Sequence, residues 1–192
     1  MEMGVLRRGL WLEYLTLGWN VVGVGIVLAA AYVARSVALV GFGLDSVIEI
    51  FASVVVVWQL TGANEGRERR ALRLIGTAFF ILALYILVQA AYLLARGSRP
   101  ETSVVGMLWL AATLIAMLLL AAGKRATGAH LGNAVLMTEA RVTLIDASLA
   151  AAVLVGLVLN ALLGWWWADP LAGLMIVYYG IKEGGAAWQG DG

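Results

Sequence analysis

The stretch Ser36–Glu49, SVALVGFGLDSVIE, decides how the rest of the chain is interpreted. It places two carboxylates, Asp45 and Glu49, inside an apolar run that extends from Val37 to Leu60. A helix brings residues four apart onto one face, one turn from each other. The run is long enough to cross a bilayer, so both acids are predicted to lie deep within it. Ionisable groups at that depth are costly and by default mark a functional site that faces the interior of a helix bundle.

The composition is typical of an integral membrane protein. Of the 192 residues, 62% are hydrophobic and the mean hydropathy is +0.92, values that do not fit a soluble domain with an ordinary core. The net charge of +1 offers no basic surface for nucleic acid. The absence of cysteine excludes disulfides, thiolate metal sites and cysteine nucleophiles. Glu13 interrupts the first apolar run and no small-residue cleavage site follows, so we expect no cleaved signal peptide.

Six apolar segments predict an all-α membrane protein with six transmembrane helices. Most of them are near the ~20 residues that a helix needs to cross the hydrocarbon core. We expect one transmembrane domain over residues 1–184 and a short cytoplasmic tail over residues 185–192. The segments are Leu10–Val33, Val37–Leu60, Leu74–Ala95, Val104–Ala122, Asn133–Leu163 and Trp165–Ile181.

The distribution of basic residues predicts the orientation in the membrane. Nine fall at the two chain ends and in the second-to-third and fourth-to-fifth loops, against three in the opposite loops. The positive-inside rule therefore predicts a multi-pass protein of the cell (inner) membrane with both termini in the cytoplasm. The nine are Arg7, Arg8, Arg67, Arg69, Arg70, Arg73, Lys124, Arg125 and Lys182; the three are Arg35, Arg96 and Arg99.

A second polar group begins the fifth apolar segment. Glu139, Thr143 and Asp146 are spaced four and three apart, so they share one helix face. Helix rise places Glu49 and Asp146 at one level, each roughly 20 Å from the outer end of its segment, with Asp45 at ~13 Å. Glu139 lies a further ~10 Å toward the cytoplasm.

Carboxylates gathered at one depth cannot all stay charged and unpaired in a low-dielectric setting. Either a bound divalent cation or protonation compensates these charges. A metal-bound state and a protonated state are also the two that proton-coupled metal export requires. The alternative is a set of protonated acids hydrogen-bonded across helices. Asn20, near mid-bilayer, fits either an interhelical hydrogen bond or a place in the site. Glu13 is predicted to lie at the cytoplasmic interface. His130 is interpreted as a solvated residue of a cytoplasmic loop.

SVALVGFGLDSVIE resembles the second membrane helix of the cation diffusion facilitator family, which carries an S-x-A-L run followed by two ligands four apart. Asp45 and Glu49 match those ligands, and Asp146, followed by an apolar stretch through LVGLVLN, matches the second ligand of the fifth helix. Ala168-Asp169-Pro170 resembles the DP sequence that opens the sixth helix. The resemblance implies that the first, second, fourth and fifth helices surround the site, with the third and sixth paired beside them. The assembly we expect is a homodimer.

The chain departs from that family in two places. The family's first ligand in the fifth helix, often His, falls here at Val142, which cannot coordinate a metal; Glu139 or the hydroxyl of Thr143 is the expected substitute. The family usually carries a cytoplasmic metal-binding domain after the sixth helix. Only KEGGAAWQGDG follows Ile181, so the chain is similar in layout to a short branch without that domain.

The expected function is secondary transport that exports a divalent cation by proton antiport. The expected metal ligands are Asp45, Glu49, Asp146 and Glu139, with Asn20 and Thr143 as supporting polar groups. All-oxygen ligands suit manganese or ferrous iron, and zinc is possible through carboxylates. No nucleophile or cofactor motif is found, so we expect neither an enzyme nor a cofactor beyond the transported ion. The alternatives are a metal-binding channel or sensor and a transport-inactive structural family member.

Overall fold

The computed structural model describes residues 2–60, 65–97, 99–131 and 134–189. Within these ranges it describes every side chain except those of residues 2–6, 52–60, 65–72, 74–75, 131, 134–136, 138–139 and 189. The described chain is helical apart from short connections and contains no strand, which confirms the prediction of an all-α protein. Its helices are α1 (Glu2–Ala34), α2 (Val37–Leu60), α3 (Glu65–Arg96), α4 (Val104–Leu131), α5 (Ala134–Leu163) and α6 (Ala168–Gln189).

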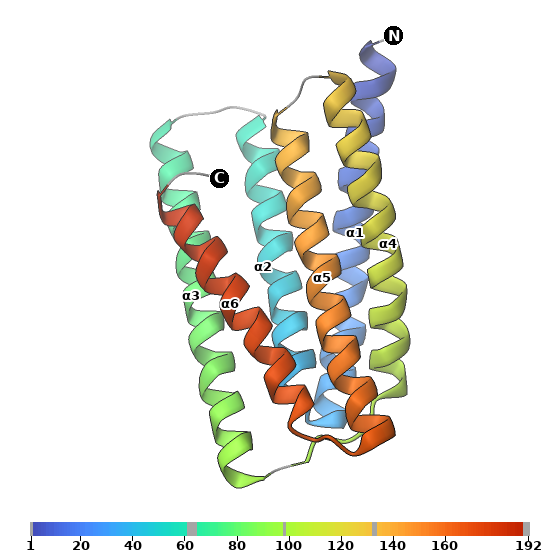
Figure 1. Ribbon diagram of the computed structural model, residues 1–192. Coiled ribbons are helices and arrows are strands. Elements are labelled where there is room, and N and C mark those ends of the chain that lie inside the picture. Colours follow the sequence, from blue (N-terminus) through green and yellow to red (C-terminus); the bar gives the residue numbers. More distant parts are fainter. Residues whose placement is uncertain (1, 61–64, 98, 132–133, 190–192) are drawn as a thin grey trace.

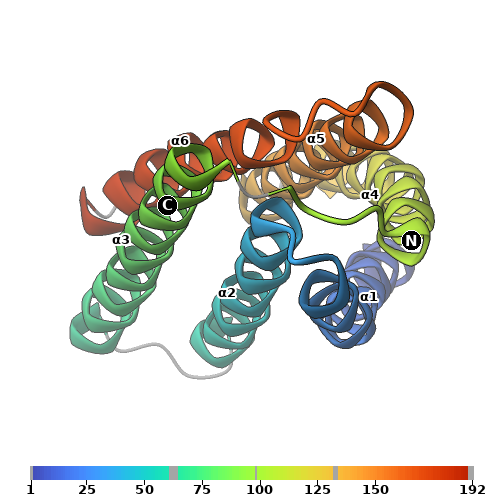
Figure 2. The same cartoon turned by 90° about the horizontal axis from the view of Figure 1, so that it is seen from below.

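The helices form two groups (Figure 1). In the first group, α1 packs against α2 and α4, and α5 packs mainly on α4. In the second, α3 packs mainly on α6, as the end-on view of Figure 2 makes clear. α2 belongs to both groups, because it contacts α3 and α6 as well as α1. This is the arrangement that the family resemblance implied.

The helices have the length and surface of membrane spans. Among the described residues, four stretches are long and apolar enough to cross a bilayer: Arg7–Ala34, Gly76–Arg96, Val104–His130 and Ala140–Leu163. Large apolar side chains point outward from them, such as Leu119 with 69% exposed. A surface of this kind is covered by lipid rather than water in a stable protein. The chain is therefore a multi-pass membrane protein.

Two helices extend beyond the spans that hydropathy predicted. α3 begins at Glu65 instead of Leu74, and α4 continues to Leu131 instead of ending at Ala122. The added turns are rich in Arg, Glu, Lys and Ala, which are good helix formers. Hydropathy marks where a helix lies in the membrane, and these charged turns continue the helix outside that region.

The sixth helix begins later and ends later than expected. Gly164, with φ +67°, follows the end of α5 in the left-handed conformation that commonly terminates helices. Trp165 and Trp167 then stack on each other at 5.1 Å outside any helix, and both remain exposed. α6 runs from Ala168 to Gln189 and so continues past residue 184, where we expected the transmembrane domain to end.

A buried hydrogen-bond link joins the beginnings of α2 and α6. Ser36 caps α2, since its Oγ accepts a hydrogen bond of 3.0 Å from the Leu39 amide. The same hydroxyl donates to Asp169 Oδ1, and the Val37 amide donates to Asp169 Oδ2 at 3.1 Å. Ser36 and Asp169 are both fully buried. The S-x-A-L and DP sequences therefore meet, and the link fixes the register of α2.

Candidate metal centre

Three carboxylates meet between α2 and α5. Asp45 and Glu49 come from α2 and Asp146 from α5, and each offers one oxygen so that the three oxygens lie within 4.8 Å of one another. Asp45 and Asp146 are buried, with 5% and 2% exposed, while Glu49 is half-buried. The structure thus brings together the three acids that the sequence placed at one depth.

The two helices hold these acids at one level because each is bonded to a neighbouring segment at the same end of the bundle, α2 at its start and α5 near its end. The Ser36–Asp169 link fixes the start of α2. Near the end of α5, Asn160 Nδ2 donates a hydrogen bond of 3.0 Å to the Pro100 carbonyl in the connection between α3 and α4. Counted from these bonded ends, the helix rise places Glu49 of α2 and Asp146 of α5 each roughly 20 Å along its helix, and so at the same depth.

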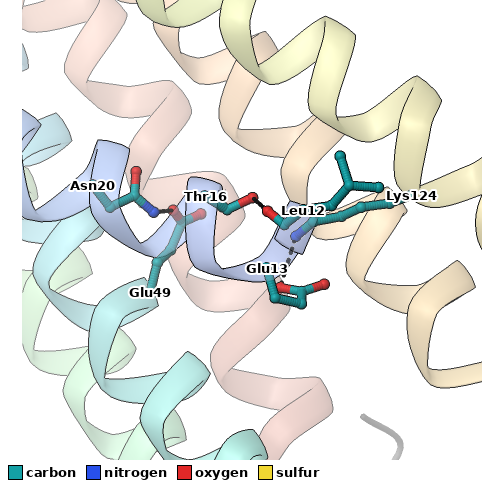
Figure 3. A network of polar contacts seen from close by, with 6 residues as sticks. All are labelled: Leu12, Glu13, Thr16, Asn20, Glu49 and Lys124. Carbon is teal, nitrogen blue, oxygen red and sulfur yellow. Dashed lines mark hydrogen bonds and ion pairs between the residues drawn. The ribbon is translucent and has the colours of Figure 1, made fainter. Parts of the chain in front are cut away.

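Asn20 of α1 supports the centre through Glu49 of α2. Its Nδ2 donates a hydrogen bond of 3.0 Å to Glu49 Oε2, as Figure 3 shows. Asn20 is buried, with 4% exposed, so this donor is shielded from water. Hydrogen bonds to an ionised acceptor are among the stronger ones in proteins. The bond orients Glu49 and leaves α1 with a direct connection to the carboxylates.

The donor set fits a divalent cation. Asp146 Oδ1 is buried and has no hydrogen-bond partner among the described residues, a condition that costs free energy unless a cation or proton satisfies the oxygen. Two oxygens on opposite sides of a zinc ion are at most about 4.2 Å apart, since Zn–O distances are ~2.1 Å. Small side-chain rotations would therefore suffice to bring all three oxygens onto one ion.

The remaining predicted site residues lie around α5 and α4. Thr143 is buried one turn before Asp146 on α5, and Val142 is half-buried. The side chain of Glu139 lies outside the described residues. His130 belongs to the last turn of α4 instead of a loop, and it is exposed.

Glu13, which we expected at the cytoplasmic interface, forms an ion pair with a lysine of α4. Lys124 Nζ donates to Glu13 Oε2 at 2.9 Å, and the Lys124 side chain is 0% exposed against 27% for Glu13. Glu13 and Asn20 are seven residues apart on α1 and so share one helix face, and Figure 3 shows this ion pair and the Asn20–Glu49 hydrogen bond along that helix. We expected Lys124 in a cytoplasmic loop, but α4 continues past it and the lysine side chain is buried in the bundle.

Sequence reasoning missed three residues near the centre. Lys124 continues the buried spacing of Thr113 and Met117 along α4, and that period was the signal that could have found it. The sequence indicated Asp169 only as part of the DP motif. It did not predict that this carboxylate accepts hydrogen bonds from the start of α2. Glu183 is half-buried on α6, which packs against the helix of Asp45, and nothing in its local sequence indicates this burial.

Comparison with known proteins agrees with the geometry. Residues 72–187, more than half of the chain, match the model of the cation efflux transmembrane domain. The chain is also 27% identical over 187 residues to Transmembrane protein 163 of Xenopus laevis. That alignment covers 92% of this chain and 66% of the relative, so the chain spans just under two thirds of the relative's length.

Proposed function

This chain belongs to the cation efflux family, and from that premise we propose that it is a secondary transporter that exports a divalent metal cation by proton antiport. One observation carries the proposal. Three carboxylates from two helices converge within 4.8 Å inside the bundle, where their charges need a cation or protons as compensation. The candidate ions are manganese, ferrous iron and zinc, because carboxylate oxygens accept all three.

Protons and metal compete for the same oxygens, which supports coupled exchange. A divalent ion entering from the cytoplasm displaces protons from Asp45, Glu49 and Asp146, and protons from the outer side displace the ion. The centre then returns with its charge neutralised. Glu139 and Thr143, on the cytoplasmic side of Asp146 along α5, guard the approach. Alternating access arises from rocking of the α1–α2–α4–α5 group.

The proposal includes six membrane spans with both termini in the cytoplasm, in a homodimer of the cell membrane. The distribution of basic residues supports this orientation, since eight of the nine predicted on the cytoplasmic side, against three on the other, remain when buried Lys124 is set aside. α1 begins and α6 ends toward the same end of the bundle in Figure 1, as six spans require. Trp165 and Trp167 then lie at the outer interface, where indole rings are favoured.

The test is transport of a panel of divalent ions into vesicles reconstituted with the purified protein, together with an internal pH indicator. We expect saturable uptake of at least one of manganese, ferrous iron and zinc, accompanied by proton movement in the opposite direction. Asp45→Asn should abolish uptake, whereas Glu101→Gln, an exposed acid of the outer connection, should leave it unchanged. If the native protein moves no divalent ion, the export proposal is wrong.

The same experiment separates the rival functions. Large current without saturation would identify a channel. Metal binding without flux would identify a sensor. If the double variant Asp45→Asn, Asp146→Asn leaves the cellular role of the protein unchanged, the chain is a transport-inactive structural member of the family.

A further inference from the structure

The ion pair between Glu13 and Lys124 is an unusual feature of the bundle interior. Lys124 is among the largest fully buried side chains of the protein, and its ammonium bonds one oxygen of Glu13 across α1 and α4. The other oxygen, Glu13 Oε1, is buried and has no hydrogen-bond partner among the described residues. The lysine therefore satisfies only one of the two carboxylate oxygens of Glu13.

The pair lies beside the carboxylate centre. Glu13 precedes Asn20 by seven residues on α1, which is about 10 Å of helix on the cytoplasmic side. Figure 3 shows the Glu13–Lys124 pair and the Asn20–Glu49 hydrogen bond along the same stretch of α1. The centre also holds the other buried oxygen without a hydrogen-bond partner in the described part of the chain, Asp146 Oδ1. The positive charge on α4 thus contacts an acid of α1 about two helical turns from the residue that bonds the centre.

A purely structural role does not account for this placement. Removing two charges from water costs more free energy than packing apolar residues of similar volume at the same positions. Lys124 lies in a segment of α4 that follows a long apolar run, where leucine or methionine would fill the space without that cost. A buried ammonium in the helix bundle that also holds three carboxylates is therefore better explained by its effect on their charge.

We propose that Lys124 is an internal counter-ion of the carboxylate centre, held by Glu13, that lowers the affinity of the centre for its divalent cation. This inference rests on the proposed function, because it names the residue that tunes the same metal site. Three carboxylates with no opposing charge hold a divalent ion tightly, and a transporter must also release it; ion pathways in general need binding weak enough to permit exit. Lys124 supplies that weakening without occupying a ligand position.

Neutralising either member of the ion pair should shift Kd in opposite directions, which gives a sharp test. Lys124→Gln keeps a hydrogen-bond donor for Glu13 but removes the positive charge, so it should tighten metal binding. Glu13→Gln keeps an acceptor for Lys124 but leaves the ammonium uncompensated, so it should weaken metal binding. Coulomb's law for a divalent ion at ~10 Å predicts at least a roughly four-fold change in Kd even at the dielectric constant of water.

The measurement is the Kd for Mn²⁺ and Zn²⁺, determined by calorimetry on the full chain in detergent micelles. The double variant Glu13→Gln, Lys124→Gln should lie between the two single variants. Arg125→Gln removes a neighbouring exposed cation of α4 and should leave Kd unchanged. Thermal unfolding of each variant establishes that it is folded. If Lys124→Gln alone fails to fold, the double variant compared with Glu13→Gln isolates the loss of the ammonium, and tighter binding is expected.

Opposite shifts of Kd in the two single variants support the inference. Equal Kd values, or shifts in the same direction, in folded variants overturn it and leave the pair as a link between α1 and α4. Absence of metal binding by the native protein is a different result, since it overturns the proposed function itself.

Discussion

At the scale of single residues, Asn20 shows how a neutral side chain can control a charged site. It donates one hydrogen bond to Glu49, one of the three carboxylates. Groups that orient ligands in this way typically contribute 10- to 100-fold to metal affinity. The same residue joins α1 to the ligands of α2, so the position of Glu49 depends on how α1 packs.

We therefore expect Asn20→Ala to weaken metal binding by about 10-fold or more, because Glu49 loses the donor that orients it. The measurement is Kd for Mn²⁺ or Zn²⁺ in micelles. Thr16→Val is the matched control, since the Thr16 hydroxyl donates to the Leu12 carbonyl of its own helix at 2.9 Å. A Kd equal to that of the native protein would show that Asn20 does not orient Glu49.

The site could be predicted only in part from the sequence. Asp45, Glu49 and Asp146 were found together because helix rise converts position in the chain into depth. Lys124 was missed because a lysine near a span end normally marks the cytoplasmic loop. Its burial depends on how far α4 continues and on which side it faces, and neither follows from charge counting.

At the scale of helices, the start of α2 is bonded to α6 through Asp169. This carboxylate accepts hydrogen bonds from Ser36 and from the Val37 amide, and it is fully buried. The connection between α3 and α4 adds a further link, since the Glu101 amide donates to the Ala34 carbonyl of α1 at 2.8 Å. These helix ends are therefore closely tied together.

Asp169→Asn should lower the stability of the protein, because hydrogen bonds to a charged acceptor contribute about 1.5–3 kcal/mol each. The change would appear as a lower melting temperature in micelles, measured by circular dichroism. Glu101→Gln, which alters an exposed acid nearby, serves as the control and should melt like the native protein. Equal melting temperatures for the two variants would contradict a stabilising role for Asp169.

Glycine packing gives a second prediction at this scale. A Cβ on Gly156 of α5 would lie 2.8 Å from the Ala172 Cβ and 3.0 Å from the Ala168 carbonyl oxygen of α6. Backbone atoms cannot move aside cheaply, so Gly156→Ala should destabilise the protein by roughly 1–3 kcal/mol. Gly18→Ala meets nothing within 4 Å and should be neutral or slightly stabilising. Chemical unfolding in mixed micelles would measure both, and equal stabilities would refute the close contact of α5 with α6.

The helices themselves were largely predictable, and their ends were not. Six apolar segments match six helices in order, since the need to bury backbone polar groups in lipid leaves few alternatives to a helix. Hydropathy carries no information about the charged turns at Glu65 or Leu131. It also could not separate Trp165–Trp167 from α6, because tryptophan is apolar enough to extend the segment.

At the scale of the whole molecule, proton coupling makes a prediction about equilibrium binding. Metal ligands must be deprotonated, so protons and the ion compete for the same oxygens. We expect metal affinity to fall as pH falls, by up to about ten-fold per pH unit for each proton displaced. Calorimetry in buffers of different ionisation enthalpy would count the released protons. A Kd independent of pH, with no proton release, would contradict antiport through these carboxylates.

The link between Ser36 and Asp169 also has a mechanical consequence. Because it attaches α2 to α6 at one end, that end acts as a fulcrum and α2 as a lever arm. Glu49 lies farther from the fulcrum than Asp45, at ~20 Å against ~13 Å of helix. A tilt of about 10° would move Glu49 by roughly 3.5 Å and Asp45 by only about 2.3 Å, on the same helix rise. Small rotations of α2 would thus separate the three ligands unequally, and the ligand that moves most is the one that α1 holds through Asn20.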